Sequence, residues 1–131
     1  MLNAHLKSVP KQLVRSDQAG DWTYGKDGQL IATVVEQRFS PESELAVAVH
    51  ELIEGYLCWR SGTTDEQVVK FDNLYEDERS HGHHGEYDEP GDDERAPYKQ
   101  EHQAATHVER AVCHALGITW EEHCEQVKRE T

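Results

Sequence analysis

The segment from Leu45 to Trp59 constrains the fold more than any other part of the chain. Most of its residues are apolar, yet His50, Glu51 and Glu54 interrupt it near its centre. A helix that is apolar around most of its circumference is buried in the protein core. A buried carboxylate is costly unless an opposite charge or a metal ion compensates it. We therefore expect a buried helix whose ionisable groups have partners inside the fold.

The composition is that of one acidic domain, residues 1–131. Of the 131 residues, 26 are Asp or Glu and 13 are Lys or Arg, so the formal net charge is −13. This excess argues against direct binding of nucleic acid, because phosphates are bound by clustered basic side chains. Its simplest consequence is solubility. Two other interpretations remain open: binding of cationic ligands, and an acidic mimic that occupies a basic site on another protein.

Neither membrane insertion nor disulfide bonding is expected. No run of residues approaches the ~20 apolar residues that span a bilayer, and residues 1–10 lack the apolar core of a signal peptide. The three cysteines, Cys58, Cys113 and Cys124, are too few and too far apart for a disulfide framework. We therefore expect a cytoplasmic protein whose reduced thiols fill the core rather than bind metal.

The secondary-structure signals predict an α+β fold that is predominantly helical. Residues 22–24 and 30–35 are rich in β-branched and aromatic residues, and residues 25–28 carry a turn signal, so together they predict an N-terminal β-hairpin. The first twenty residues predict at most a short helix or a docking arm. About four helices follow the hairpin. They are expected at residues 41–60, 64–75, 97–116 and 119–127, with Ser40, Thr64 and Thr119 as N-caps and Gly62 and Gly117 as C-terminal stops.

Residues 76–96 differ in composition from the rest of the chain. They are rich in acidic residues, Gly and Pro and contain almost no apolar residue, which predicts a flexible or ligand-ordered loop. The loop contains His81, His83 and His84. These histidines have three interpretations: a solvated low-complexity segment, a metal tether, or a lid over a site.

His50 and Glu54 share one face of the expected helix, because residues four apart are neighbours on a helix surface. A helix can hold a metal ion with two ligands that are four residues apart. Glu51 projects beside them, where it can reach a water molecule on the metal without binding the metal itself. His50 and Glu54 adjoin the expected apolar arc of this helix, which is made of Leu45, Val49, Leu52, Tyr56 and Trp59.

The same projection on the helix at residues 97–116 selects His102 and Glu109. Both lie at the edge of the apolar arc, whereas His107 and His114 fall on the wet face. Among the histidines of this helix, His102 is therefore the one placed to complete a site. Glu109 has two possible roles: it orients His102 through the free ring nitrogen, or it binds the metal itself.

His50, Glu54 and His102 would form a set of two histidines and one carboxylate with open positions. Such a set is typical of catalytic rather than structural zinc. The expected cofactor is a divalent metal, most simply zinc, with Glu51 as the general base. Two alternatives remain open: an exposed acidic stripe, and a metal-free network with a basic side chain. The candidate bases for that network are Arg60 and Arg110.

The segment Val47-Ala-Val-His50-Glu51-Leu-Ile-Glu54 resembles the active-site helix of zincin metallopeptidases, which reads H-E-x-x-H. A β-strand followed by the metal-binding helix is also the zincin order. Glu54 stands where the second histidine belongs, so a metal-binding group is kept at that position. Residues 44–120 also resemble a group of small uncharacterised phage and prophage proteins. That resemblance is carried by His50-Glu-Leu-Ile-Glu54, Phe71-Asp72, Pro90-Gly-Asp-Asp93, Ala96-Pro-Tyr98, Gln100-Glu-His102, Ala105-Thr106 and Glu109.

Together these features lead to one functional expectation and one alternative. The expectation is a small zincin-like, metal-dependent hydrolase that acts on an amide or a phosphoester. The alternative is a non-enzymatic acidic phage accessory protein, either with a structural metal site or as a mimic of nucleic-acid charge that inhibits a host protein. The resemblance to phage proteins implies the host cytoplasm as the location. Because 131 residues leave little room for a deep cleft, a homo-oligomer could complete the site.

Overall fold

A three-stranded sheet forms the base of the fold in the computed structural model, which describes residues 2–14 and 18–129. The strands are β1 (Ala4–Val9), β2 (Gly20–Tyr24) and β3 (Leu30–Val35), in the spatial order β1-β3-β2. β3 pairs antiparallel with β2 and parallel with β1. Alternate residues of β3 face the core: Leu30, Ala32 and Val34 are at most 1% exposed.

The expected hairpin is confirmed, but the sheet has one strand more than the sequence predicted. Gly25 and Gly28 close the turn between β2 and β3 with a backbone hydrogen bond of 3.0 Å. β1 occupies the segment for which a short helix or docking arm was expected. Most residues of β1 are exposed, so it lacks the alternation that marks a half-buried strand. Its partner β3 is distant in sequence, and a local pattern does not reveal such a pairing.

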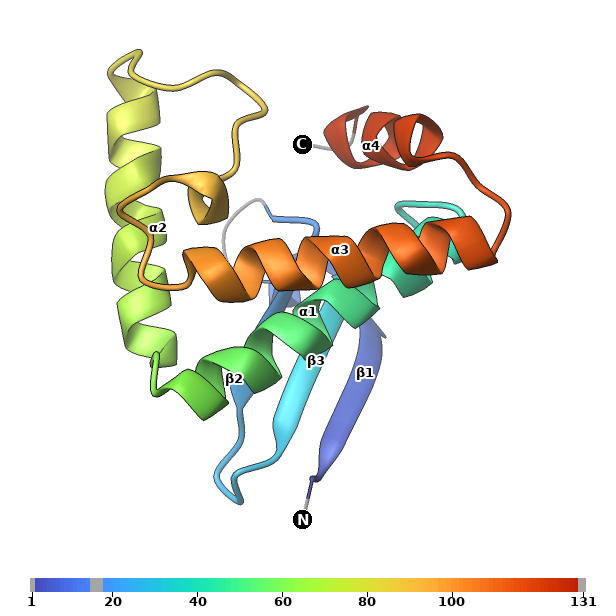
Figure 1. Ribbon diagram of the computed structural model, residues 1–131, viewed down its shortest axis with the longest axis horizontal. Coiled ribbons are helices and arrows are strands. Elements are labelled where there is room, and N and C mark those ends of the chain that lie inside the picture. The colour runs from blue at the N-terminus through green and yellow to red at the C-terminus, as the bar shows by residue number, and fades with distance from the viewer. Residues whose placement is uncertain (1, 15–17, 130–131) are drawn as a thin grey trace.

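Four α-helices and two short 3-10 helices complete the described chain. They are, in chain order, the 3-10 helix η1 (Lys11–Leu13), α1 (Pro41–Ser61), α2 (Asp65–Ser80), the 3-10 helix η2 (Pro90–Asp92), α3 (Lys99–Ala115) and α4 (Trp120–Arg129). α1 crosses one face of the sheet, α3 lies on the outer side of α1, and α2 stands at one end of this stack (Figure 1). The fold is therefore α+β and predominantly helical, as expected. None of the helices within residues 2–14 and 18–129 has the length and apolarity needed to span a membrane.

The predicted start and end of α1 and the predicted start of α2 are confirmed by capping contacts, whereas α3 begins at Lys99, two residues after the predicted start at Pro97. The Ser40 hydroxyl accepts a hydrogen bond from the Ser43 backbone N–H at 3.2 Å, and α1 ends at Gly62 in the left-handed conformation. Thr64 and Gln67 form a reciprocal capping box at the start of α2. The end of α2 differs from the prediction, because the helix continues to Ser80, into the segment expected to be a loop.

The expected burial of His50 and Glu54 is confirmed, but the arc of large apolar residues on α1 is more exposed than expected. Leu45 and Trp59 are 43% and 63% exposed, whereas His50 and Glu54 are each 6% exposed. Small residues such as Ala48 pack toward the sheet and let the helix backbone approach the strands. α3 covers the face that carries His50 and Glu54. The helical projection was wrong here because it ranked residues by apolarity and took no account of their size.

Candidate metal centre

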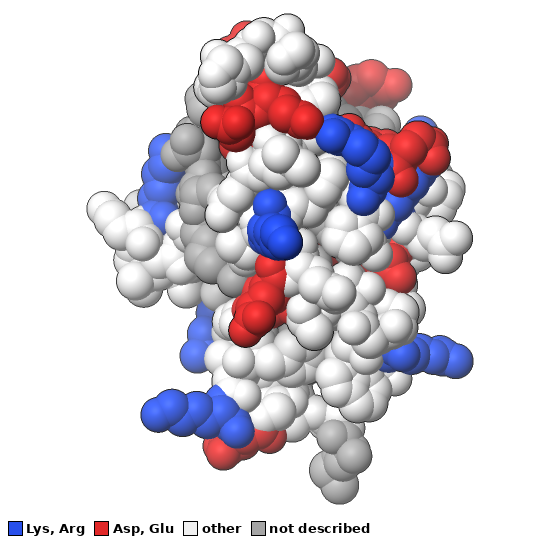
Figure 2. All heavy atoms as spheres, turned by 90° about the vertical axis from the view of Figure 1, so that its left-hand side faces the viewer, with Lys and Arg blue, Asp and Glu red and all other residues white. Residues whose placement is uncertain are grey.

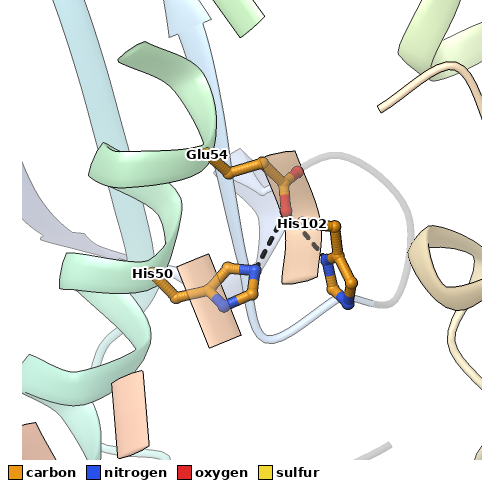
Figure 3. A group of neighbouring side chains, drawn as sticks. All are labelled: His50, Glu54 and His102. Carbon is orange, nitrogen blue, oxygen red and sulfur yellow. Dashed lines mark hydrogen bonds and ion pairs between the residues drawn. The ribbon is translucent and has the colours of Figure 1, made fainter. Parts of the chain in front are cut away.

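α1 and α3 bring His50, Glu54 and His102 together inside the fold (Figure 3). One carboxylate oxygen, Glu54 Oε2, lies 3.0 Å from His50 Nε2 and 2.9 Å from His102 Nδ1. The two imidazole rings meet edge to face with their centroids 4.9 Å apart. The residues are only 6–7% exposed. The convergence that the sequence predicted between the two helices is therefore present.

Glu54 is held as an anion by its surroundings. Burial opposes its ionisation, but hydrogen bonds with His102 and His50 outweigh burial and lower its pKa to about 2. Its second oxygen, Oε1, accepts a hydrogen bond of 3.1 Å from the Trp22 indole N–H. Arg60 and Arg110 were the bases considered as alternative partners, and both are exposed. The partners of this buried carboxylate are thus two imidazoles and an indole.

The 3-10 helix η2 fixes the outer side of His102. Glu89 Oε2, next to η2, lies 2.9 Å from His102 Nε2, and Asp92 Oδ1 lies 3.6 Å from the same nitrogen. Gly91 is buried against the ring, and a Cβ atom built there would lie 2.4 Å from His102 Cγ. A glycine is therefore needed for the backbone to pack flat on the imidazole. The Pro90-Gly-Asp segment had drawn attention only through a family resemblance, and its contact with His102 was missed.

Glu109 contacts His50 rather than His102. Its Oε1 lies 2.8 Å from His50 Nδ1, although without the alignment of a full hydrogen bond. The expectation that Glu109 orients His102 is therefore corrected: Glu89 occupies that position on His102. Glu109 and Glu54 instead hold the two nitrogens of the His50 ring. A role of Glu109 as a direct metal ligand stays a prediction.

His123 of α4 is the buried site residue that sequence reasoning missed. It is 1% exposed, and its Nε2 hydrogen-bonds the second oxygen of Glu109. Its Nδ1 lies 2.9 Å from the Ser43 hydroxyl in the first turn of α1. The sequence does contain a pattern that indicates its burial: Trp120 lies three residues before His123, and Val127 lies four residues after it. This spacing places His123 on the inner face of an amphipathic helix.

Glu51 lies beside the converging ligands but is not one of them. Its side chain is half-buried and passes close to β2, where a Cβ atom built on Gly20 would lie 2.9 Å from Glu51 Cγ. Burial, followed by the negative charge of Glu54, raises the pKa of Glu51 well above its ordinary value. The structure thus places the Glu51 carboxyl next to the site, and its role as a general base stays a prediction.

The loop histidines lie outside the centre. His81 and His83 are exposed, while the ring of His84 stacks on Tyr75 with a centroid distance of 3.8 Å and pairs with Glu78. These contacts fix His84 on α2 rather than over the site.

The buried thiols and the two solvent-facing histidines of α3 lie where the sequence predicted them. Cys58 and Cys113 are buried free thiols whose pKa values are raised by burial, in keeping with small core residues. His107 and His114 are exposed, as the projection predicted.

The donor set of the centre fits a divalent transition metal. The three ligand atoms of His50, Glu54 and His102 lie within 4.8 Å of one another. Zinc binds imidazole nitrogen and carboxylate oxygen at about 2.0–2.2 Å in tetrahedral geometry, which separates neighbouring ligand atoms by about 3.3 Å. The present separations of 2.9 and 3.0 Å would need to widen by only a few tenths of an ångström. Glu89, Asp92 and His102 form a second possible group, but its two carboxylates are exposed.

No family model, no curated protein and no solved structure matches this chain in the comparisons made.

The metal-free protein is expected to lose stability as the pH rises from about 6 to about 8.5. Burial lowers the pKa of His102, but hydrogen bonds to Glu54 and Glu89 outweigh burial and raise it from 6.5 to about 10. The folded protein thus keeps a proton that the unfolded chain releases near pH 6.5. The resulting stabilisation is complete below pH 6.5 and is lost as the pH rises toward 10. Each pKa unit corresponds to about 1.4 kcal/mol, so a loss of a few kcal/mol is expected by pH 8.5.

Urea unfolding in the presence of a chelator at the two pH values measures this loss. His102→Gln is the matched control and should reduce the alkaline decline. Part of the decline remains, because burial lowers the pKa of His50 but its contacts with Glu109 and Glu54 outweigh burial and raise that pKa well above 6.5. A wild-type free energy of unfolding that stays constant over this range would contradict the assigned hydrogen bonds.

Proposed function

We propose that this protein is a small metal-dependent hydrolase in which His50, Glu54 and His102 hold one divalent metal, most simply zinc. The observation that carries the proposal is the convergence of two imidazole nitrogens on one oxygen of a buried carboxylate. Two histidines and a carboxylate leave at least one coordination position for water or substrate. A zinc ion with an open position polarises a bound water and lowers the pKa of that water to about 7.

The surrounding side chains orient the three proposed ligands and supply the general base. Trp22 donates to Glu54 Oε1, which leaves Oε2 directed toward the two imidazoles. Glu89 holds the far nitrogen of His102 and Glu109 lies against the far nitrogen of His50, so both rings are fixed in orientation. Glu51 lies outside the ligand set and close to it, and it is assigned to take the proton of the water and to deliver it to the leaving group.

A non-enzymatic protein with a structural metal is the second candidate. The low exposure of the three ligands, 6–7%, favours it, because structural sites are closed to solvent. A cavity of about 640 Å³ lies at the corner between α3 and α4, lined by residues such as Arg110 and Trp120, and not over the three ligands. A mimic of nucleic-acid charge has less support: on the face that carries α2, basic side chains lie among the acidic ones (Figure 2).

Replacing Glu51 with Gln separates the two candidates. The variant keeps the size of the side chain but cannot accept a proton, so turnover should fall by about 100-fold or more while one zinc per chain is retained. The assays use bis(p-nitrophenyl) phosphate and a fluorogenic peptide library as probes. Glu66→Gln, an exposed change in the first turn of α2, is the matched control. A zinc-loaded wild type without turnover on either probe would favour the structural role, and an E51Q variant as active as wild type would remove Glu51 from the mechanism.

A further inference from the structure

His123 joins α4 to both helices that form the candidate metal centre. Its Nδ1 lies 2.9 Å from the Ser43 hydroxyl of α1, and its Nε2 hydrogen-bonds Glu109 of α3. Glu109 reaches in turn to His50 Nδ1 at 2.8 Å. A continuous line of polar contacts therefore runs from the last helix to a proposed metal ligand. At 1% exposure, His123 is far more buried than an isolated polar side chain would be without a specific partner.

Each oxygen of the Glu109 carboxylate has its own imidazole. Oε1 faces His50 and Oε2 faces His123, so the carboxylate is fixed at two points and cannot rotate without losing one of them. Burial opposes ionisation of Glu109, but the hydrogen bond with His123 and the close contact with His50 outweigh burial and lower its pKa to about 2. An anion beside His50 Nδ1 favours the tautomer that carries a proton there. With a metal bound in place of the proton between His50 and Glu54, Nε2 would be the nitrogen left free to bind it.

Ser43, His123 and Glu109 are also the residue types of a serine-hydrolase triad. Here Ser43 is fully buried in the first turn of α1 and His123 is 1% exposed, so no substrate carbonyl can reach the hydroxyl. This excludes a nucleophilic role for Ser43 in the described fold. The remaining function for the cluster is to hold Glu109 in place.

We propose that His123 is a positioning residue for the metal centre, acting on His50 through Glu109. The inference rests on the proposed function, because it assumes that His50 binds a metal. It makes α4 part of the site rather than a peripheral helix. A group that contacts a histidine ligand directly is typically worth about 10–100-fold in metal affinity. Here that group is Glu109, and His123 holds it in place.

Docking of α4 does not depend on His123 alone. The Gln126 side chain accepts a hydrogen bond of 2.8 Å from the Ser40 backbone N–H, and Val127 packs against the cluster of Val34, Val47 and Ala48. The Thr119 hydroxyl caps the helix by accepting from the Glu122 N–H. Substitutions that keep the size and polarity of His123 should therefore leave α4 in place.

Two amide substitutions separate the contacts of His123. In His123→Gln the amide nitrogen lies near the position of Nε2 and can still donate to Glu109. In His123→Asn the amide lies near the position of Nδ1 and reaches Ser43 only. Zinc affinity is measured by chelator competition, and the cobalt-substituted protein gives the d–d absorption spectrum. We expect H123N to bind zinc 10–100-fold more weakly with an altered cobalt spectrum, and H123Q to remain within about threefold of wild type.

His107→Asn, an exposed change on α3, is the matched control and should leave both readouts unchanged. The positioning role would be overturned if H123N and H123Q lost zinc affinity equally and in step with their loss of thermal stability. Wild-type zinc affinity in H123N would also overturn it. A wild type that binds no zinc would overturn the proposed function and this inference with it, which distinguishes the two failures.

If H123N does not fold, Glu109→Gln, His123→Ala and the double variant E109Q/H123A take its place. E109Q removes the anion and is expected to weaken zinc binding by 10–100-fold. If His123 acts through Glu109, then H123A weakens zinc binding in the wild-type background and adds no further loss in the E109Q background. Independent, additive losses, or wild-type zinc affinity in E109Q, would overturn the proposed connection.

Discussion

Replacing Glu54 with Gln is expected to weaken zinc binding by at least about 100-fold. The change keeps the shape of the side chain and removes the negative charge on which the two imidazoles converge. Loss of an outer-shell partner alone costs 10–100-fold in metal affinity, so loss of one of three proposed ligands should cost more. Chelator competition with the purified variant measures the affinity.

The fold should also be affected by E54Q, because His50 and His102 lose the partner that holds their protons. Removing one member of a buried ion pair typically destabilises a protein by about 3–5 kcal/mol. Circular dichroism must therefore confirm that the variant is folded under the titration conditions. Glu66→Gln, exposed on α2, serves as the control for a generic loss of negative charge. If E54Q binds zinc as tightly as the wild-type protein, Glu54 is not a ligand.

Removal of the metal is expected to lower the melting temperature by about 10 °C or more. A ligand present at 1,000 times its dissociation constant stabilises the folded state by about 4 kcal/mol. In domains of this size 1 kcal/mol corresponds to roughly 2–8 °C. Without a metal, the Glu54 carboxylate depends on protonated imidazoles for its counter-charge.

Differential scanning calorimetry of the zinc-loaded and the chelator-treated protein at pH 7.5 measures this shift. E54Q provides the internal control, because a variant that cannot hold zinc should melt at the same temperature with and without chelator. A wild-type curve unaffected by the chelator would mean that the site is empty or does not contribute to the fold.

The sequence was informative wherever the physical cause is local. Ser40, Thr64 and Thr119 cap helices through contacts with residues three positions away, so their roles could be predicted from the chain alone. The pairing of His50 with Glu54 is equally local, since the two residues are one helical turn apart. His102 could be selected because its neighbours fix which face of its helix is buried.

The parts that could not be predicted depend on contacts between elements. Glu109 lies at the edge of the apolar face of α3, and only the packing of α3 on α1 decides that it faces His50. Gly91 and Glu89 reach His102 from a loop whose composition resembles that of a flexible segment. β1 is mostly exposed and gains its register from β3, at a distance in sequence that no local pattern spans.

An anomalous difference map at the zinc absorption edge tests the central claim most directly. Crystals are grown from protein that carries one equivalent of zinc. The expected result is one peak per chain, about 2.0–2.2 Å from His50 Nε2, His102 Nδ1 and a Glu54 carboxylate oxygen. A peak located only at His81, His83 or another surface group, with none between α1 and α3, would contradict the account.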